Sequence, residues 1–339
     1  LRGEPSSYVR ARLKPELPDP AMAIMNALGF HAMTVGNHDF DFGMDILRGA
    51  EQQAQFPWIS ANTILDSTGK PAFTPYVKIE MGGASVAIVG FTTPAVPTFE
   101  EPGNIAGLKF LDIVETARTL IPRLREREKV DLVIVALHSG LGRSPGAPLD
   151  ENEALALADQ VPGIDLILTG HTHQAITTKR NGIPILQAQS QGRALGVAEL
   201  LLRRVKGKWH LDSIDTRLAR PDAATAADPQ VLELTAPLRR LTDTYLDTAA
   251  TVLATDLDGR WSHMEDSAIV QLLHKVQLQA TKADISAIAS PGAKIFIPKG
   301  TTSVRQFYAL MPYENHAARI RVTGQQLRLY LEHAARFFN

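Results

Sequence analysis

The stretch Val35-Gly36-Asn37-His38-Asp39-Phe40-Asp41-Phe42-Gly43 follows a short apolar run. It sets an amide, an imidazole and a carboxylate side by side between two glycines. A hydrophobic core has no need of three consecutive polar residues of these types. A metal centre does, because Asn supplies a neutral oxygen ligand, His a proton donor and a neighbouring Asp a partner that orients the His. The alternative is a polar turn that closes a strand, and the remaining motifs decide between the two.

The composition excludes several classes of protein. The 339 residues are 45% hydrophobic and 21% charged, which is typical of a globular chain long enough for two domains. A net charge of −1 without a long basic run argues against a nucleic-acid polymer as partner. No apolar stretch approaches the roughly 20 residues that span a bilayer. The absence of cysteine excludes disulfides and thiolate metal ligands. The composition does not indicate an oligomeric state.

Three apolar runs, at 32–35, 131–137 and 164–169, each predict a strand that ends in a turn bearing histidine. The second run ends at His138 and the third at Gly170-His171-Thr172-His173. Because ligands collect at the carboxyl ends of strands in α/β sheets, we predict that these turns converge on one site. Together with Asn37 they offer nitrogen and oxygen ligands without thiolate, which suits Zn, Mn, Fe or Co.

A composition change marks a domain boundary. Residues 220–229 are rich in Pro, Ala and Asp, and a leucine-bearing helical pattern follows. We expect a first domain over residues 1–220, a connector helix over 228–249 and a second domain over 250–339. Strands are expected within the second domain at 283–288 and 318–322.

The order of motifs resembles that of the calcineurin-like metallophosphoesterases: Gly-Asn-His-Asp, then a strand ending in His, then Gly-His-x-His. Three further segments are similar to the 5′-nucleotidase / 2′,3′-cyclic-nucleotide 2′-phosphodiesterase family: Glu151-Asn152, Pro312-Tyr313-Glu314-Asn315 and Leu331-Glu332-His333-Ala334-Ala335. The resemblance implies an α/β (α+β sandwich) fold. A four-layer αββα metallophosphatase domain would be followed by the connector helix and part of a smaller α/β nucleotide-binding domain.

The resemblance also implies roles for individual residues. One divalent ion would be bound by Asn37, His138 and His171, and a second ion by His173. His38 would lie near the leaving-group oxygen and be held by Asp39, where the family usually has Glu. In the second domain Tyr313 would stack on the nucleobase, and Asn315 would also contact the substrate.

The chain departs from the family ahead of Asn37, where the family's Asp-x-His and Gly-Asp motifs do not occur. The string Leu1-Arg2-Gly3-Glu4-Pro5 resembles the residues that follow that Gly-Asp, so the chain looks truncated there, and at its other end as well. The resemblance then implies two metal ions in the full-length parent and at most one, weakly bound, here. We expect this fragment to be inactive or nearly so.

The expected reaction of the parent is hydrolysis of nucleotide phosphoesters by metal-activated water. The family's 5′-nucleotidase branch carries an arginine-bearing loop near 290–297, and this chain has no arginine there. The departure favours the 2′,3′-cyclic-nucleotide 2′-phosphodiesterase/3′-nucleotidase branch. Two alternatives remain, a sulfate thiohydrolase-like enzyme and a non-catalytic nucleotide-binding protein. Most members of the family are exported to the periplasm or cell surface.

Overall fold

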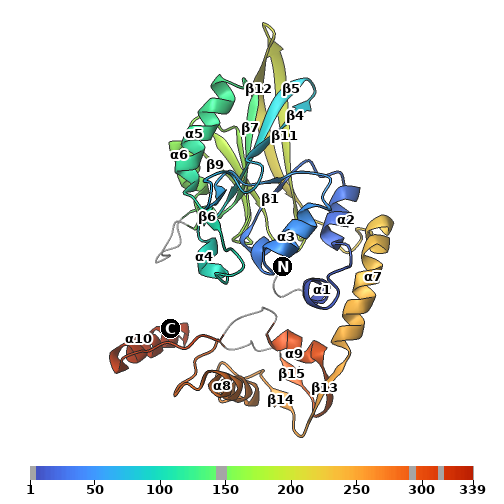
Figure 1. Cartoon of the computed structure of the whole chain (residues 1–339), viewed down its shortest axis with the longest axis vertical. Helices are drawn as coiled ribbons and strands as arrows, with labels where there is room; N and C mark the ends of the chain where they lie inside the picture. Colours follow the sequence, from blue (N-terminus) through green and yellow to red (C-terminus); the bar gives the residue numbers. More distant parts are fainter. Residues whose placement is uncertain (1–4, 143–150, 290–294, 312–316, 339) are drawn as a thin grey trace. The chain divides into compact units, whose positions relative to one another are not determined.

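The computed structural model describes residues 5–142, 151–289, 295–311 and 317–338 (Figure 1). The chain folds into two compact units. Of the described residues, the first unit takes those within 10–239, and the second takes 5–9 and those from 240 onward.

A six-stranded sheet forms the centre of the first unit, with strand order β4-β5-β7-β8-β10-β9. Its four inner strands are parallel, and the two edge strands are antiparallel to their neighbours. Continuous apolar runs build the inner strands because these are buried on both faces. The strands are β4 (Tyr76–Met81), β5 (Ala84–Thr92), β7 (Leu132–His138), β8 (Leu166–Thr169), β9 (Ala175–Arg180) and β10 (Ile183–Ala188).

Helices α5 (Ile113–Glu126) and α6 (Ala154–Gln160) cover one face of this sheet (Figure 1). Helix α5 begins after its N-cap Asp112, whose carboxylate accepts the Glu115 N–H over 2.7 Å. Its buried side chains and those of α6 pack with Val89, Phe91 and the alternate residues of β7 in the largest core cluster. This face therefore holds the main hydrophobic core.

The opposite face carries a second β layer. Strands β1 (Met33–Thr34) and β2 (Trp58–Ile59) pair with each other and contact β5, and the hairpin β11 (Leu195–Val205)–β12 (Lys208–Ala219) contacts β10. A Cβ on Gly90 of β5 would lie 2.4 Å from the Ile59 carbonyl oxygen, so the close approach of the two layers requires glycine.

Two helices pack outside β1 and β2 and complete the expected helix–sheet–sheet–helix order. They are α2 (Pro20–Ala27) and α3 (Met44–Glu51), whose residues Met22 and Leu47 share a core cluster with Val35 and Trp58. The short elements β3 (Thr63–Leu65), β6 (Leu108–Phe110) and α4 (Val96–Phe99) finish the first unit. The four-layer α/β prediction is confirmed.

Helix α7 (Pro229–Leu246) lies where the connector helix is expected, and the division between the units falls inside it. The domain limits themselves remain a prediction. Within the described residues, no helix combines the length and the apolar character needed to cross a membrane.

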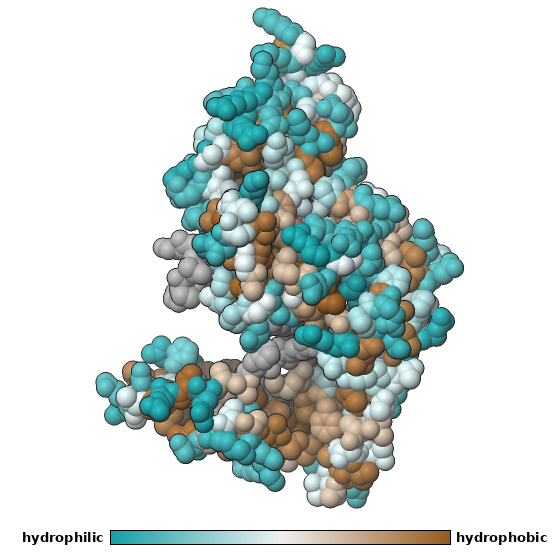
Figure 2. Space-filling view, in the orientation of Figure 1, coloured by the Kyte–Doolittle hydropathy of each residue, from teal (hydrophilic) through white to brown (hydrophobic). Residues whose placement is uncertain are grey.

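The second unit has a small core. It contains the pairs β13 (Ala249–Leu253)–β16 (Gly300–Ser303) and β14 (Leu257–Asp258)–β15 (Phe296–Ile297), with helices α8 (Ala268–Thr281), α9 (Val304–Leu310) and α10 (Gly324–Ala335). Four buried residues make up its cluster: Leu257, Ile269, Ile297 and Leu310. Apolar side chains of this unit also lie on the face seen in Figure 2, and α10 buries none of its residues.

The strands predicted at 283–288 and 318–322 are wrong, because both segments run outside any helix or strand. Their sequences have the alternation of strands, but neither segment pairs with another within the described part of the chain. A strand without a partner leaves its backbone groups unpaired and is not stable by itself.

Candidate active site

Parallel pairing brings the three predicted turns to one edge of the six-stranded sheet. Leu137 of β7 lies opposite Thr169 of β8, so both strands end at the same level. Strand β1 joins this edge because the Thr34 hydroxyl donates to the Ala136 carbonyl oxygen over 2.8 Å. The predicted convergence of the turns is therefore seen in the structure.

Asn37 lies where the turns meet. Its Oδ1 is 2.9 Å from Nε2 of His138 and 3.2 Å from Nδ1 of His171. The two imidazole rings have centroids 5.3 Å apart and are inclined at 62°. Asn37 is buried, with 3% of its surface exposed. Three of the four predicted metal ligands thus form one cluster drawn from three strand ends.

This cluster fits a divalent cation. Bonds of about 2.0–2.1 Å to nitrogen or oxygen place neighbouring ligand atoms roughly 3.0–3.4 Å apart, close to the spacings seen around Asn37. Nε2 of His171 lies 2.6 Å from Oε1 of Glu151, and a carboxylate accepts the proton there. When the ring is neutral, Nδ1 is then an acceptor that faces another acceptor, the Asn37 oxygen, and a cation between the two satisfies both. A protonated ring instead donates to both oxygens.

The fit depends on the amide oxygen. Within the described ranges, no group of three or more His, Asp or Glu side chains is arranged to hold a metal ion. The cluster therefore offers a neutral ligand set in which Asn37 is indispensable. Neutral N and O ligands suit several borderline divalent metals about equally and do not identify one.

His138 is held neutral. Burial lowers the pKa of its imidazole from 6.5 to about 3, and the nearby imidazoles, His171 first among them, act in the same direction. A neutral ring keeps its lone pair for a cation. Gly36 makes room for this ring, because a Cβ there would lie 2.6 Å from Cε1 of His138.

His38 is paired with Asp41. Its Nδ1 lies 3.2 Å from both carboxylate oxygens of Asp41, whose side chain is fully buried, while 37% of the His38 side chain is exposed. Residues Asn37–Phe40 form a 3₁₀ turn, in which side chains three residues apart lie on one side. The Asp41 contact follows from that geometry.

The prediction that Asp39 holds His38 is wrong. The Asp39 carboxylate instead accepts the N–H of Gly36 over 2.7 Å and closes the start of the 3₁₀ turn. Burial raises its pKa from 3.8 to about 6, although the bond from Gly36 acts in the opposite direction. Asp39 therefore shapes the turn that carries His38, and Asp41 orients the ring.

Gln187 of β10 holds the turn that bears the histidine pair. Its side chain is almost completely buried, and its Nε2 donates to Oγ1 of Thr169 over 2.9 Å and to the carbonyl oxygen of Gly170. Its Oε1 accepts the N–H of Gln174 over 2.7 Å and the hydroxyl of Thr172 over 3.0 Å. One amide thus fixes both ends of the turn.

His171 and His173 both have left-handed backbone conformations, with φ of 69° and 57°. Such conformations are uncommon outside glycine, and they bend the backbone of this turn. His171 is enclosed, with the ring of Phe99 packed edge-on at 5.5 Å, whereas His173 is exposed. His173 nevertheless contributes to the low pKa of His138, so it lies within electrostatic reach of the cluster.

Three residues of the site were missed by the sequence reasoning. Asp41 stands three positions after His38 in the first motif, and a 3₁₀ turn there would have indicated it. Glu151 belongs to the Glu151-Asn152 pair that matches the family pattern, without an assigned role. Nothing in the sequence singles out Gln187. The predicted substrate residues Tyr313 and Asn315 lie outside the described residues.

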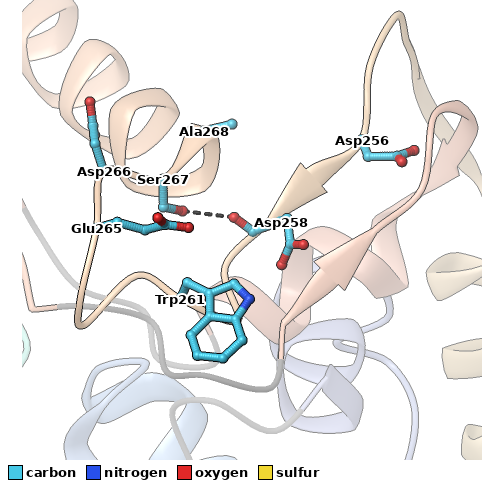
Figure 3. Close-up of a pocket in the computed structure, with 7 residues that line it drawn as sticks. All are labelled: Asp256, Asp258, Trp261, Glu265, Asp266, Ser267 and Ala268. Atoms are coloured by element: carbon cyan, nitrogen blue, oxygen red, sulfur yellow. Dashed lines mark hydrogen bonds between the residues drawn. The ribbon is translucent and has the colours of Figure 1, made fainter.

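A pocket in the second unit offers a different chemistry (Figure 3). Its lining contains the acidic residues Asp256, Asp258, Glu265 and Asp266, together with the ring of Trp261. Three of the carboxylates accept hydrogen bonds from protein groups. Asp256 accepts from the Lys299 N–H and Asp258 from the Arg260 guanidinium. Asp266 accepts from the Gln271 side-chain amide. The Arg260 pair holds the pKa of Asp258 to about 2. No histidine is among the described residues that line this pocket, so they lack the imidazole nitrogens that the Asn37 cluster offers to a metal ion.

A four-layer α/β fold with histidine-bearing strand ends is what a metallophosphoesterase is expected to have. Residues 2–175 match the calcineurin-like phosphoesterase family, and residues 246–337 match the 5′-nucleotidase C-terminal domain. The chain belongs to the calcineurin-like phosphoesterases.

Individual relatives agree with this assignment. The chain is 28% identical to a 2′,3′-cyclic-nucleotide 2′-phosphodiesterase/3′-nucleotidase of Salmonella typhimurium, over all of this chain and 60% of that protein. The crystal structure of the calcineurin-like phosphoesterase YfkN from Bacillus subtilis is similar over 71% of this chain and 81% of that one, with a TM-score of 0.65 and 28% identity. A putative 5′-nucleotidase from Staphylococcus aureus shares the fold, with a TM-score of 0.72 at 20% identity over 91% of this chain and 60% of that one.

The chain spans part of its curated relatives. It covers 60% of the Salmonella protein and 25% of a trifunctional nucleotide phosphoesterase of Bacillus subtilis to which it is 26% identical over 94% of its own length.

Proposed function

We propose that the protein containing this chain hydrolyses phosphoester bonds of nucleotides, as a 2′,3′-cyclic-nucleotide 2′-phosphodiesterase/3′-nucleotidase or a 5′-nucleotidase. The observation that carries the proposal is the convergence of Asn37, His138 and His171 beside the His38–Asp41 pair. Membership of the calcineurin-like phosphoesterases and the similarity to the Salmonella enzyme support the class of substrate.

In this proposal Asn37, His138 and His171 hold one divalent ion, and His173 contributes to a second. Bound ions of this kind polarise a phosphoryl group and lower the pKa of water. The chain's own residues add a proton or a positive charge. His38 presents its outer nitrogen to the leaving-group oxygen while Asp41 holds the ring from behind, and such a group typically contributes 10²–10⁴-fold in rate.

We further propose that the 339-residue chain by itself holds at most one ion weakly and has little activity. The described ligand atoms around Asn37 are neutral, and a divalent ion gains much of its binding energy from anionic ligands. In two-metal sites the ions are usually held by several protein ligands each.

Tyr313 and Asn315 are proposed as the substrate contacts of the second unit. Stacking of a base on an aromatic ring contributes roughly 1–3 kcal/mol and tolerates different bases. The missing arginine near 290–297 favours the cyclic-phosphodiesterase/3′-nucleotidase branch, because lysine binds phosphate less specifically than the forked guanidinium of arginine. Export to the periplasm or cell surface is part of the same proposal.

The test compares the 339-residue chain with the longest gene product that contains it. Each is assayed with 2′,3′-cyclic AMP, 3′-AMP, 5′-AMP and a thiosulfate conjugate, with Mn²⁺ or Zn²⁺ and after chelation. We expect chelator-sensitive hydrolysis of the nucleotides by the longer protein and little by the chain alone. Preference for the thiosulfate conjugate would assign a sulfate thiohydrolase. Nucleotide binding without hydrolysis by the longer protein would contradict an enzyme.

A further inference from the structure

Glu151 makes the shortest contact to the histidine cluster. Its Oε1 lies 2.6 Å from Nε2 of His171, on the side of the ring opposite to Asn37. The two side chains are 23% and 9% exposed, so the bond is largely shielded from water. We infer that Glu151 is a positioning residue, which fixes the His171 tautomer that turns an unprotonated Nδ1 toward the cation site.

The segment that carries Glu151 is anchored independently of its carboxylate. The Glu151 carbonyl oxygen accepts hydroxyl protons from Ser139 over 2.8 Å and from Thr93 over 3.0 Å. The next residue, Asn152, accepts the N–H of Gly140 through its side chain over 2.8 Å. A Cβ on Gly140 would lie 2.3 Å from that oxygen, so the segment packs closely on the end of β7. Removing the Glu151 side chain leaves these bonds in place.

The tautomer follows from the partners of the His171 ring. A carboxylate is an acceptor, so Nε2 must carry the proton that it donates to Glu151. Neutral imidazole has one N–H, and Nδ1 therefore keeps its lone pair. Without Glu151, the Asn37 oxygen 3.2 Å from Nδ1 becomes the nearest acceptor described for this ring, and the proton moves to Nδ1. A protonated Nδ1 does not bind a cation.

Glu151 also supplies negative charge behind a neutral ligand set. A carboxylate that accepts the outer N–H of a ligating histidine makes that histidine a more basic ligand, and loss of such a partner typically lowers metal affinity 10–100-fold. This consequence rests on the proposed metal site. The tautomer does not.

The tautomer is read directly by ¹⁵N NMR of the histidine rings in the metal-free 339-residue chain at about pH 8.5, with His171 assigned through a His171→Gln variant. We expect the Nε2–H form in the unsubstituted chain and in Glu151→Gln, whose amide oxygen still accepts the proton. Glu151→Ala should shift His171 to the Nδ1–H form. Glu115→Ala, which removes an exposed glutamate of α5 paired with Arg118, should change nothing.

The second readout is Co²⁺ affinity, measured by absorbance on the unsubstituted chain and on Glu151→Gln, Glu151→Ala and Glu115→Ala. We expect the Co²⁺ Kd to rise about 10–100-fold in Glu151→Ala, less in Glu151→Gln, and to stay constant in Glu115→Ala. An Nδ1–H ring in the unsubstituted chain, an unchanged tautomer in Glu151→Ala, or an unchanged Kd after the tautomer has shifted would overturn the inference. Absence of nucleotide hydrolysis by the longer protein would contradict the proposed function and leave the tautomer result standing.

Discussion

At the scale of single residues, the site combines two buried ionisable groups whose pKa values are shifted in opposite directions. Burial lowers the pKa of His138 to about 3 and raises that of Asp39 to about 6. Both groups are therefore favoured in their uncharged forms. Each makes a separate contribution to the pH dependence of stability, and the two have opposite signs.

Asp39→Asn should stabilise the chain at neutral pH. The folded pKa of Asp39 lies above its ordinary 3.8, so the buried charge costs stability above about pH 6 and this cost disappears as the pH falls toward 4. An asparagine oxygen still accepts the Gly36 N–H. We expect the free energy of unfolding in urea to rise by roughly 2 kcal/mol at about pH 7.5 and not at about pH 4. The exposed Glu80→Gln is the control, and an equal gain at both pH values would contradict this account.

His138→Gln should reduce the loss of stability in acid. The folded pKa of His138 lies below 6.5, so its contribution is complete above pH 6.5 and is lost as the pH falls toward 3. For the unsubstituted chain this amounts to roughly 2 kcal/mol between about pH 7.5 and about pH 5. The measurement is urea unfolding of both proteins at the two pH values. Parallel losses in both would show that His138 is not held neutral by the fold.

At the scale of elements, the strand ends bring the proposed metal ligands together, and the turns orient their side chains. Continuous apolar runs predicted β7 and β8, and parallel pairing then required His138 and the 170–173 turn to share an edge. The aim of each side chain depends on features that sequence periodicity does not show. The 3₁₀ turn selects Asp41 over Asp39, and a side-chain amide from β10 holds the histidine turn.

Gln187→Leu tests the second of these features. The substitution keeps the size of the side chain but removes four hydrogen bonds from the turn that carries His171 and His173. Buried groups left unpaired cost about 1–3 kcal/mol each, and some of these partners will find water. We expect the free energy of unfolding to fall by about 2–4 kcal/mol and Co²⁺ affinity to fall with it.

Gln160→Leu, at the exposed end of α6, is the matched control for Gln187→Leu and should change neither quantity by more than about 0.5 kcal/mol. If Gln187→Leu unfolds at the same urea concentration as the unsubstituted chain, the turn is held by something other than this amide.

At the scale of the whole molecule, the sequence predicted the first unit better than the second. The first unit has long apolar runs that end in histidine-bearing turns, and these runs predicted the convergence of the turns. Its four layers were expected from the resemblance to the calcineurin-like metallophosphoesterases. In the second unit, 283–288 and 318–322 have strand-like patterns but pair with nothing that the structure describes. An alternating sequence forms a strand only where a neighbouring strand accepts and donates its backbone hydrogen bonds. The presence of that neighbour depends on distant parts of the chain and cannot be read from the segment itself.

We propose that a divalent ion binds between Asn37, His138 and His171. The most direct measurement is anomalous diffraction from crystals of this chain soaked in Mn²⁺. We predict an anomalous peak about 2.0–2.3 Å from Asn37 Oδ1, His138 Nε2 and His171 Nδ1. No peak at these atoms, or a peak in the acidic pocket of Asp256, Asp258, Glu265 and Asp266 instead, would contradict the claim.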